Sequence, residues 1–177
     1  MAGGRDEEYV GFAESALPRL RRTAYLLCGD WHRAEDAAQE ALIRLYVAWP
    51  RVQRREGLMP YAHRTLVRIL VDQSRRPWRR EMASVEGIEP EAARDAFGQV
   101  NTRLVLVAAL QKVSPRRRAC VVLRFFNDLS VTETAALLGC TEGTVKSQTA
   151  RGLAELRVLL DRVGVTGIEL EERVSTP

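Results

Sequence analysis

The sequence has few of the residues on which enzyme active sites and metal centres depend. Its only histidines are His32 and His63, and its three cysteines, Cys28, Cys120 and Cys140, are far apart and odd in number. Such a set argues against a disulfide framework and fits a reducing compartment. Cys28 and His32 form half of a metal-ligand pattern, but no second pair completes it. With no P-loop and no dinucleotide-binding glycine motif, we expect no catalysis, no metal and no cofactor.

Long apolar runs are also missing. No segment approaches the roughly 20 apolar residues that a membrane-spanning helix needs, and the first ten residues carry acidic groups rather than an apolar stretch. The 46% of hydrophobic residues in a chain of 177 is nevertheless enough for one moderate core or two small ones. We therefore expect a soluble, cytoplasmic protein without membrane insertion.

Lysine is scarce as well, because Lys112 and Lys146 are the only two among 27 basic residues. With 23 acidic residues the net charge is +4, so bulk charge alone is a weak sign of nucleic-acid binding. The arginines are clustered, however. The clusters lie at residues 19–22, 51–55, 75–80 and 116–118. Each fits either a solvated helix face or a phosphate-binding surface.

Helical periodicity dominates the chain, and no convincing alternating strand pattern occurs, which predicts an all-α protein. One helix is predicted after Asp30 as N-cap, with Pro50 as its stop. Its apolar face comprises Ala34, Ala38, Ala41, Leu42, Leu45, Tyr46 and Trp49. A second helix is predicted from Pro60 to about Arg76. It carries an apolar stripe of Tyr61, Leu66, Ile69 and Leu70 beside a basic stripe of Arg64, Arg68 and Arg75.

The composition then changes. Residues 77–101 mix charge, Gly and Pro without sustained periodicity, which is typical of a flexible linker that holds at most a short helix near residues 91–97. A second helical unit starts near Thr102 and breaks at Ser114 and Pro115. Two small helical domains joined by a linker are therefore predicted. Their boundaries are residues 1–76, 77–101 and 102–161, followed by a weakly ordered tail over 162–177.

The second unit contains two short helices with explicit start and stop signals. Ser130 followed three positions later by Glu133 is a capping box, which predicts that one helix begins directly after Ser130. Gly139 supplies the left-handed conformation that ends this helix. Thr141 is a suitable N-cap for a second helix over Glu142–Leu160. The two helices are thus separated by only a few residues.

Small and apolar residues lie where a helix-turn-helix needs them. Ala135 precedes Gly139 by four residues and allows the helices to approach closely, while Val145 fills the angle between them. An ordinary helical hairpin is the alternative. The remaining polar face favours DNA reading, because the first half of a recognition helix enters the major groove. That face carries Lys146, Ser147, Gln148 and Arg151.

Together with the first unit, this motif resembles a known family. The chain has, in order, "AEDAAQEALIRLYVAW", an Arg-rich loop, "PYAHRTLVRILVDQSRR", a linker and "VTETAALLGCTEGTVKS". Over roughly residues 10–160 this resembles the bacterial sigma factors of the extracytoplasmic-function type, in the sigma-70 family. The resemblance implies a region 2 domain that binds core RNA polymerase and melts the −10 element. It also implies a region 4 domain whose helix-turn-helix reads the −35 element.

The resemblance further implies partners and residue roles for an alternative sigma factor that performs no catalysis itself. The partners are promoter DNA, core polymerase through its β′ clamp helices and β subunit, and an anti-sigma factor. Core binding is assigned to Asp36, Gln39, Glu40 and Arg44. The −10 DNA is assigned to Arg54, Arg55, Tyr61, Arg64, Arg68, Arg75 and Arg76. The −35 DNA is assigned to Thr144, Lys146, Ser147, Gln148 and Arg151. Read without the family, Asp36 and Glu40 fit a solvated face, and Tyr61 and Trp49 fit a core.

The sequence departs from the family pattern in two places, one on the predicted second helix and one in the recognition helix. Arg68 stands four residues before Asp72 where the family usually has Asn, which predicts different −10 contacts. In the recognition helix, "VKSQTARG" replaces the usual "VKSRLHRA", so Gln148 and Gly152 predict a different −35 preference. Gly152 is also expected to cost about 1 kcal/mol of local helix stability relative to Ala.

A DNA-binding regulator with a helical input domain is the rival interpretation from outside the family. Such a regulator needs a ligand or phosphoacceptor site in its first unit, and no acidic pocket following predicted strands is found there. It also binds its duplex tightly alone, whereas a sigma factor binds DNA specifically only with core polymerase. Binding to core polymerase therefore separates the two.

Overall fold

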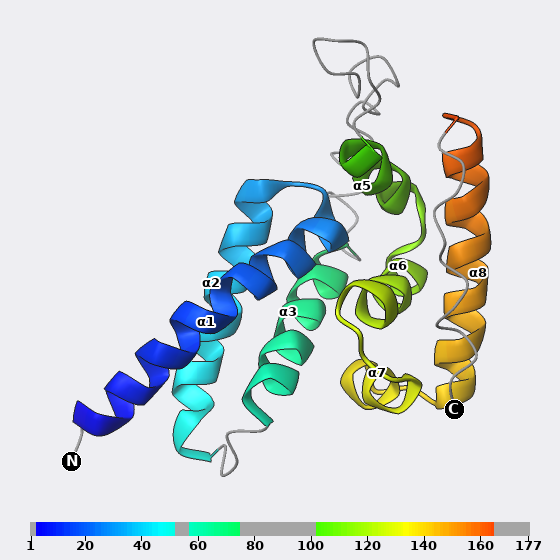
Figure 1. Ribbon diagram of the computed structural model, residues 1–177. Coiled ribbons are helices and arrows are strands. Elements are labelled where there is room, and N and C mark those ends of the chain that lie inside the picture. The colour runs from blue at the N-terminus through cyan, green and yellow to red at the C-terminus, as the bar shows by residue number, and fades with distance from the viewer. Residues whose placement is uncertain (1–2, 52–56, 75–101, 165–177) are drawn as a thin grey trace, which may run out of the picture. The chain divides into compact units, whose positions relative to one another are not determined.

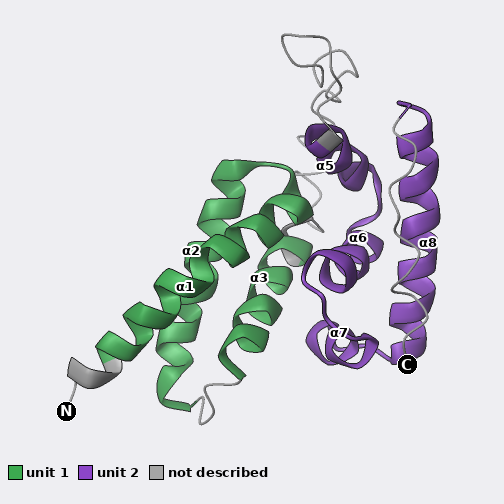
Figure 2. Cartoon of the chain, viewed as in Figure 1, with its two compact units in different colours: residues 1–73 green, residues 74–177 purple. Residues whose placement is uncertain are grey.

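The computed structural model describes residues 3–51, 57–74 and 102–164, and every one of its regular elements in these ranges is helical. The all-α prediction is therefore confirmed. The chain divides into two compact units, residues 1–73 and 74–177 (Figure 2). The predicted linker and tail fall outside the described residues, apart from the first residues of the tail up to Gly164.

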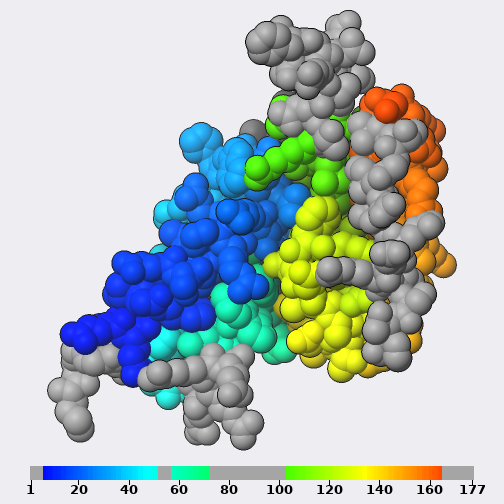
Figure 3. Space-filling view, viewed as in Figure 1, coloured from blue at the N-terminus to red at the C-terminus, as the bar shows by residue number. Residues whose placement is uncertain are grey.

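Unit 1 opens with a long helix that was not predicted from the sequence. Helix α1 (Gly3–Cys28) contains Pro18 and ends at Gly29, whose backbone has φ 73° and whose N–H donates to the Tyr25 carbonyl at 2.7 Å. Its buried face carries small and apolar residues at spacings of three and four, which are Ala16, Leu20, Ala24 and Leu27. In the space-filling view, α1 (dark blue) runs across the visible face of this unit (Figure 3).

Helix α2 (Trp31–Ala48) packs against α1 and follows the predicted pattern closely (Figure 1). The Asp30 carboxylate accepts the Arg33 N–H at 2.8 Å, which confirms the N-cap. The alanines and leucines of the predicted face are buried. Tyr46, predicted on that face, is instead 43% exposed and meets Tyr9 edge to face, because it lies at the rim of the α1–α2 contact. A 3₁₀ turn, Trp49–Arg51, follows.

Helix α3 (Leu58–Ser74) begins two residues before the predicted start at Pro60. Pro60 is tolerated there because the N–H groups of a first helical turn have no intrahelical acceptor. Leu66, Ile69 and Leu70 are buried as predicted, and His63 is buried with them. Burial, followed by the nearby Arg19 charge, lowers the pKa of His63 to about 4. The imidazole is therefore neutral at pH 7 and belongs to the core.

Unit 2 consists of four α-helices and one π-helical turn within its described part. The elements are α5 (Thr102–Lys112), α6 (Pro115–Val121), the π turn η3 (Val122–Phe126), α7 (Val131–Leu138) and α8 (Glu142–Asp161). Ser114 precedes Pro115 at the start of α6, which confirms the predicted break. Helix α8 packs along α6 and also contacts α5 and α7 (Figure 1). Helix α8, the candidate recognition helix, thus contacts each of the other α-helices described in this unit.

The arginine cluster of α6 is not a solvated face. Arg118 is buried and donates to the Gln111 side chain of α5. Arg117 is half-buried and forms an ion pair with Glu155 of α8, while Arg116 is exposed. Two of the three guanidinium groups therefore join α6 to its neighbours inside unit 2.

Gly152 lies where α8 packs tightly against α6. A Cβ at this position would lie 2.8 Å from Cγ2 of the buried Val121 and 3.3 Å from the Arg117 carbonyl oxygen. The structure thus corrects the propensity argument, because a glycine that weakens an isolated helix permits this helix pair to pack. Helices α6 and α8 can approach this closely only because residue 152 has no side chain.

Gly152→Ala is expected to lower the free energy of unfolding by about 1 kcal/mol. The gain in helix propensity, about 1 kcal/mol, is outweighed by an overpacking cost of about 1–3 kcal/mol. Gly11→Ala is the matched control, since a Cβ added at that exposed glycine of α1 would meet open space and should stabilise the protein. Urea unfolding followed by circular dichroism measures both, and stabilisation by Gly152→Ala would contradict the packing argument.

Candidate DNA-reading and partner-binding surfaces

Local hydrogen bonds fix both ends of α7. The Ser130 N–H donates to Glu133 Oε2 at 2.7 Å, and the Glu133 N–H donates to Ser130 Oγ at 3.1 Å. These two bonds form the predicted capping box, and α7 begins at Val131 as expected. At the other end Gly139 has φ 65° and donates its N–H to the Ala135 carbonyl. Both predicted ends of α7 are confirmed.

The start of α8 is fixed to α7 as well as capped. The Thr144 N–H donates to Thr141 Oγ1 at 3.2 Å, which confirms Thr141 as N-cap. The Thr132 hydroxyl of α7 donates to Glu142 Oε1 at 2.6 Å across the turn. Val145 is fully buried in the angle between the helices. This geometry is a helix-turn-helix whose second helix is held at its first residues.

The predicted −35 residues differ in how much of each side chain remains available. Lys146 and Arg151 are exposed, and neither has an ion pair within the described residues of unit 2. The hydroxyl groups of Thr144 and Ser147 are engaged locally, since Thr144 Oγ1 lies 2.9 Å from Thr141 Oγ1 and Ser147 Oγ donates to the Thr144 carbonyl at 3.0 Å. Gln148 is half-buried. The two cations are thus exposed on this face without an ion pair among the described residues.

Glu133→Ala is expected to destabilise the protein at neutral pH and to have less effect in acid. The backbone hydrogen bond from Ser130, and then its side chain, lower the pKa of Glu133. A carboxyl group whose folded pKa is depressed stabilises the fold above its unfolded pKa and loses that contribution as pH falls through the folded value. Because the side chain is exposed, we expect about 0.5 kcal/mol at pH 7. Melting temperatures of both proteins from pH 7 to pH 3 measure it, and a constant difference would contradict the assignment.

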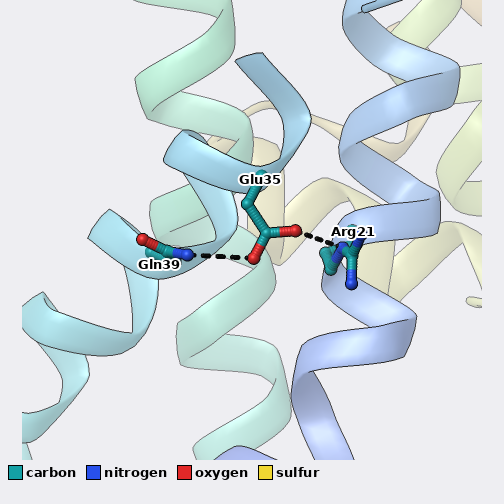
Figure 4. Close-up of polar contacts among 3 residues, drawn as sticks. All are labelled: Arg21, Glu35 and Gln39. Carbon is teal, nitrogen blue, oxygen red and sulfur yellow. Dashed lines mark hydrogen bonds and ion pairs between the residues drawn. The ribbon is translucent and has the colours of Figure 1, made fainter. Parts of the chain in front are cut away.

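The predicted core-binding residues lie on the outer side of α2. Asp36 is exposed, and Glu40 forms an ion pair with Arg44 one turn further along. Gln39 Nε2 donates to Glu35 Oε1 at 2.9 Å, and Glu35 in turn pairs with Arg21 of α1 (Figure 4). The structure therefore brings these side chains together on one surface, which we call the α2 outer face.

Two residues of the α2 outer face were not predicted from the sequence. Ile43 is 63% exposed and Val47 is 74% exposed, although both are large aliphatic residues. They follow Asp36 by seven and eleven residues, a spacing that continues one face of a helix. That spacing was the available signal, since it separates them from the buried residues of α2. The α2 outer face therefore carries two exposed apolar side chains beside its charged groups.

The predicted −10 residues are only partly described. Tyr61 and Arg64 are half-buried on α3, and Arg68 is exposed. Arg54, Arg55, Arg75 and Arg76 lie outside the described residues. Trp49 is half-buried, with its ring centroid 5.4 Å from that of Tyr9 and 6.0 Å from that of Phe12. The aromatic contacts of Trp49 agree with the core alternative for that residue.

Cys28 and His32, which form half of a metal-ligand pattern in the sequence, lie near the turn between α1 and α2. The Cys28 thiol donates to the Asp30 carbonyl at 3.2 Å, and His32 is exposed. Among residues 3–51, 57–74 and 102–164, no group of three His, Cys, Asp or Glu side chains is placed to hold a metal ion.

Cys120 is buried, and burial raises the pKa of its thiol to about 12. None of the helices described in these ranges is long and apolar enough to cross a membrane.

Comparisons with known proteins agree with the two-unit organisation. The family model Sigma-70 region 2 matches residues 12–80, and Sigma-70, region 4 matches residues 103–156. The chain is 32% identical over 179 residues to the RNA polymerase sigma-E factor of Streptomyces avermitilis, covering 98% of this chain and 97% of that protein. It is 32% identical over 152 residues to the ECF RNA polymerase sigma factor SigM of Mycobacterium tuberculosis, covering 86% and 76%.

A solved structure shares the fold. The sigma factor RpoE from Bartonella quintana, in complex with the anti-sigma factor NepR, aligns with a TM-score of 0.69 and 24% identity over 88% of this chain and 98% of that chain. Taken with the sequence matches along nearly the whole chain, the helix-turn-helix of unit 2 and the helices of unit 1 correspond to sigma regions 4 and 2. The chain belongs to the extracytoplasmic-function RNA polymerase sigma factors of the sigma-70 family.

Proposed function

We propose that this protein binds core RNA polymerase and directs promoter-specific transcription initiation through −10 and −35 recognition. The observation that carries the proposal is the capped helix-turn-helix, with Lys146 and Arg151 exposed on α8, in a chain that also matches sigma region 2. The proposed domains are region 2 over residues 1–76, a linker over 77–101, region 4 over 102–161 and a tail over 162–177. Neither domain is assigned a catalytic step, a metal or a cofactor.

In the proposed complex, α8 enters the major groove of the −35 element. Lys146 and Arg151 contact phosphate or guanine, and Gln148 reads adenine where its carboxamide can reach the base edge. Thr144 and Ser147 stay close to their own helix, as their hydrogen bonds favour. In the −10 element, Arg64 and Arg68 hold the backbone of the separated strand together with Arg54, Arg55, Arg75 and Arg76. Tyr61 supplies an aromatic surface for an unstacked base.

The α2 outer face is the proposed contact with the β′ clamp helices of core polymerase. Asp36 and Glu40 supply charge, Gln39 and Arg44 supply hydrogen bonds, and Ile43 and Val47 supply apolar area. This mixture fits the ordinary anatomy of a protein interface, in which an apolar centre lies beside polar groups. The β subunit of core polymerase is a further proposed partner.

The same surfaces suit regulation by an anti-sigma factor. The RpoE protein of the structural comparison was solved bound to one, and a protein that covers either proposed surface would prevent initiation. We accordingly propose an anti-sigma partner for this chain. We also propose a cytoplasmic location, where core polymerase and promoter DNA are found.

Transcription from fragmented genomic DNA by core polymerase, with and without this protein, tests the proposed function. New RNA 5′ ends that share two upstream elements are the expected result, and they would also supply the promoter sequence. If a folded protein and an active core give no new starts, direct binding to core decides the outcome. Binding without starts indicates a missing activator, whereas no binding and tight binding to duplex DNA alone would indicate a regulator of another kind.

A further inference from the structure

Glu35 lies on α2 within reach of α1, and both of its carboxylate oxygens have partners. Oε2 pairs with Arg21 Nε on α1, while Oε1 accepts the 2.9 Å hydrogen bond from Gln39 Nε2 on α2 (Figure 4). The Glu35 side chain is 29% exposed, and Gln39 is exposed beside it. A side chain of α1 therefore acts on the α2 outer face through a single carboxylate.

We propose that Glu35 and Arg21 are positioning residues for the binding of core polymerase, because they fix the carboxamide of Gln39 in one orientation. The inference rests on the proposed docking role of the α2 outer face. An ionised carboxylate only accepts hydrogen bonds, so Gln39 must turn its NH₂ group toward Glu35. Its oxygen then points away from Glu35, as Figure 4 shows, and remains available to an N–H donor of the partner.

The charges around Gln39 favour the same kind of partner group. Of the three acidic residues on this side of α2, Glu35 pairs with Arg21 and Glu40 pairs with Arg44. Asp36 has no ion pair in the part of unit 1 that the structure describes. The face therefore presents one uncompensated carboxylate close to a fixed neutral acceptor. Both bind arginine or lysine side chains, and bonds from such donors are the stronger ones.

Stability is a poor explanation for this network. Exposed ion pairs contribute little to folding because water and salt screen them. The α1–α2 pair is held by buried apolar residues instead, which include Leu20 and Ala24 of α1 and Ala34, Ala38 and Leu42 of α2. Loss of the Glu35 contacts should therefore change binding more than folding.

Glu35→Ala tests the positioning role in the full-length protein. Without Glu35 as acceptor, the Gln39 side chain can change rotamer in the free protein and must be ordered when core polymerase binds. Because this ordering costs entropy, we expect core polymerase to bind about 2- to 10-fold more weakly. Fluorescence anisotropy of the labelled protein titrated with core polymerase measures the affinity, and the melting temperature should stay the same. Glu14→Ala is the charge-matched control on an exposed position of α1. Unchanged affinity for Glu35→Ala overturns the inference.

Exchanging the two charges separates positioning from simple pairing. Arg21→Glu with Glu35→Arg retains an ion pair between the helices, but an arginine at position 35 only donates hydrogen bonds. Gln39 would then turn its oxygen inward and its NH₂ group toward the partner. We expect wild-type thermal stability with binding at least as weak as that of Glu35→Ala. Wild-type affinity in this variant would show that the pair matters and the orientation of Gln39 does not.

The same titration distinguishes failure of this inference from failure of the docking assignment. Asp36→Arg with Glu40→Arg changes the proposed docking residues themselves. If that double substitution abolishes core binding while Glu35→Ala binds normally, only the positioning role is wrong. If neither variant affects binding, the α2 outer face is not the docking surface and both proposals fail.

Discussion

Asp36→Arg with Glu40→Arg is expected to weaken binding to core polymerase by about 100-fold or more. Asp36 is exposed without an ion pair in the described part of unit 1, and Glu40 follows it by one helical turn. Reversing both charges removes two acceptors and places two cations against the basic groups that those carboxylates are proposed to meet. Repulsion of this kind at close range costs on the order of 3 kcal/mol, which is about 100-fold in affinity.

The fold should tolerate this change because both side chains project from the outer side of α2. An arginine at position 40 would lose the ion pair with Arg44, at a cost of only a few tenths of a kcal/mol. Glu7→Arg with Glu14→Arg is the matched control, since it alters the net charge equally at exposed positions of α1. Native circular dichroism with lost binding in the first variant, and normal binding in the control, would support the docking face. Equal binding by both proteins would place the contact elsewhere.

The sequence-based prediction of that docking face was incomplete, because it did not include Ile43 and Val47. Charged residues of α2 were assigned from the family resemblance, whereas the exposed aliphatic pair had no family motif to mark it. The spacing of the buried residues identified the inner face well, because alanines and leucines at intervals of three and four bury one stripe. Which apolar residues lie outside that stripe can be seen only after the inner face is known.

The helix-turn-helix was predictable because its determinants are local. Ser130 with Glu133, Gly139 and Thr141 each act on backbone groups within four residues of themselves, so the sequence contains both partners of every contact. The N-cap Asp30 follows the same rule. Helix α1 is the counterexample, since its buried face mixes alanines with larger apolar residues and a proline lies within the helix. Its helical period was present but weak.

Other features depend on contacts between distant residues and could not be found from spacing. Arg118 belongs to a run of three arginines, which predicts exposure, yet it is buried against Gln111 of the preceding helix. Gly152 is a poor helix residue by propensity, and its value is evident only once α6 is placed beside it. The pairing of Arg21 with Glu35 likewise joins two helices across a turn. In each case the partner's position is set by packing, which no local pattern contains.

Lys146→Ala with Arg151→Ala is expected to abolish initiation that depends on the −35 element while leaving core binding unchanged. Both side chains are exposed on the recognition helix, and neither has an ion pair in the described part of unit 2, so they are available to DNA. A good contact to a base edge is worth about 1–3 kcal/mol, and two lost contacts correspond to a reduction of at least about 30-fold. If both cations contact phosphates instead, the salt dependence of binding should become shallower by about two ion equivalents.

Arg103→Ala with Arg162→Ala controls for the loss of two positive charges. Both arginines are exposed in unit 2, and Arg162 lies roughly 24 Å along the helix from Lys146, at 1.5 Å per residue. Transcription from one promoter, with and without its −35 element, separates the possible results. The Lys146 and Arg151 variant should give the same low output from both templates, because it can no longer use the element, whereas the control should retain the full response. A −35 response that survives in the first variant would mean that α8 does not read this DNA through Lys146 and Arg151.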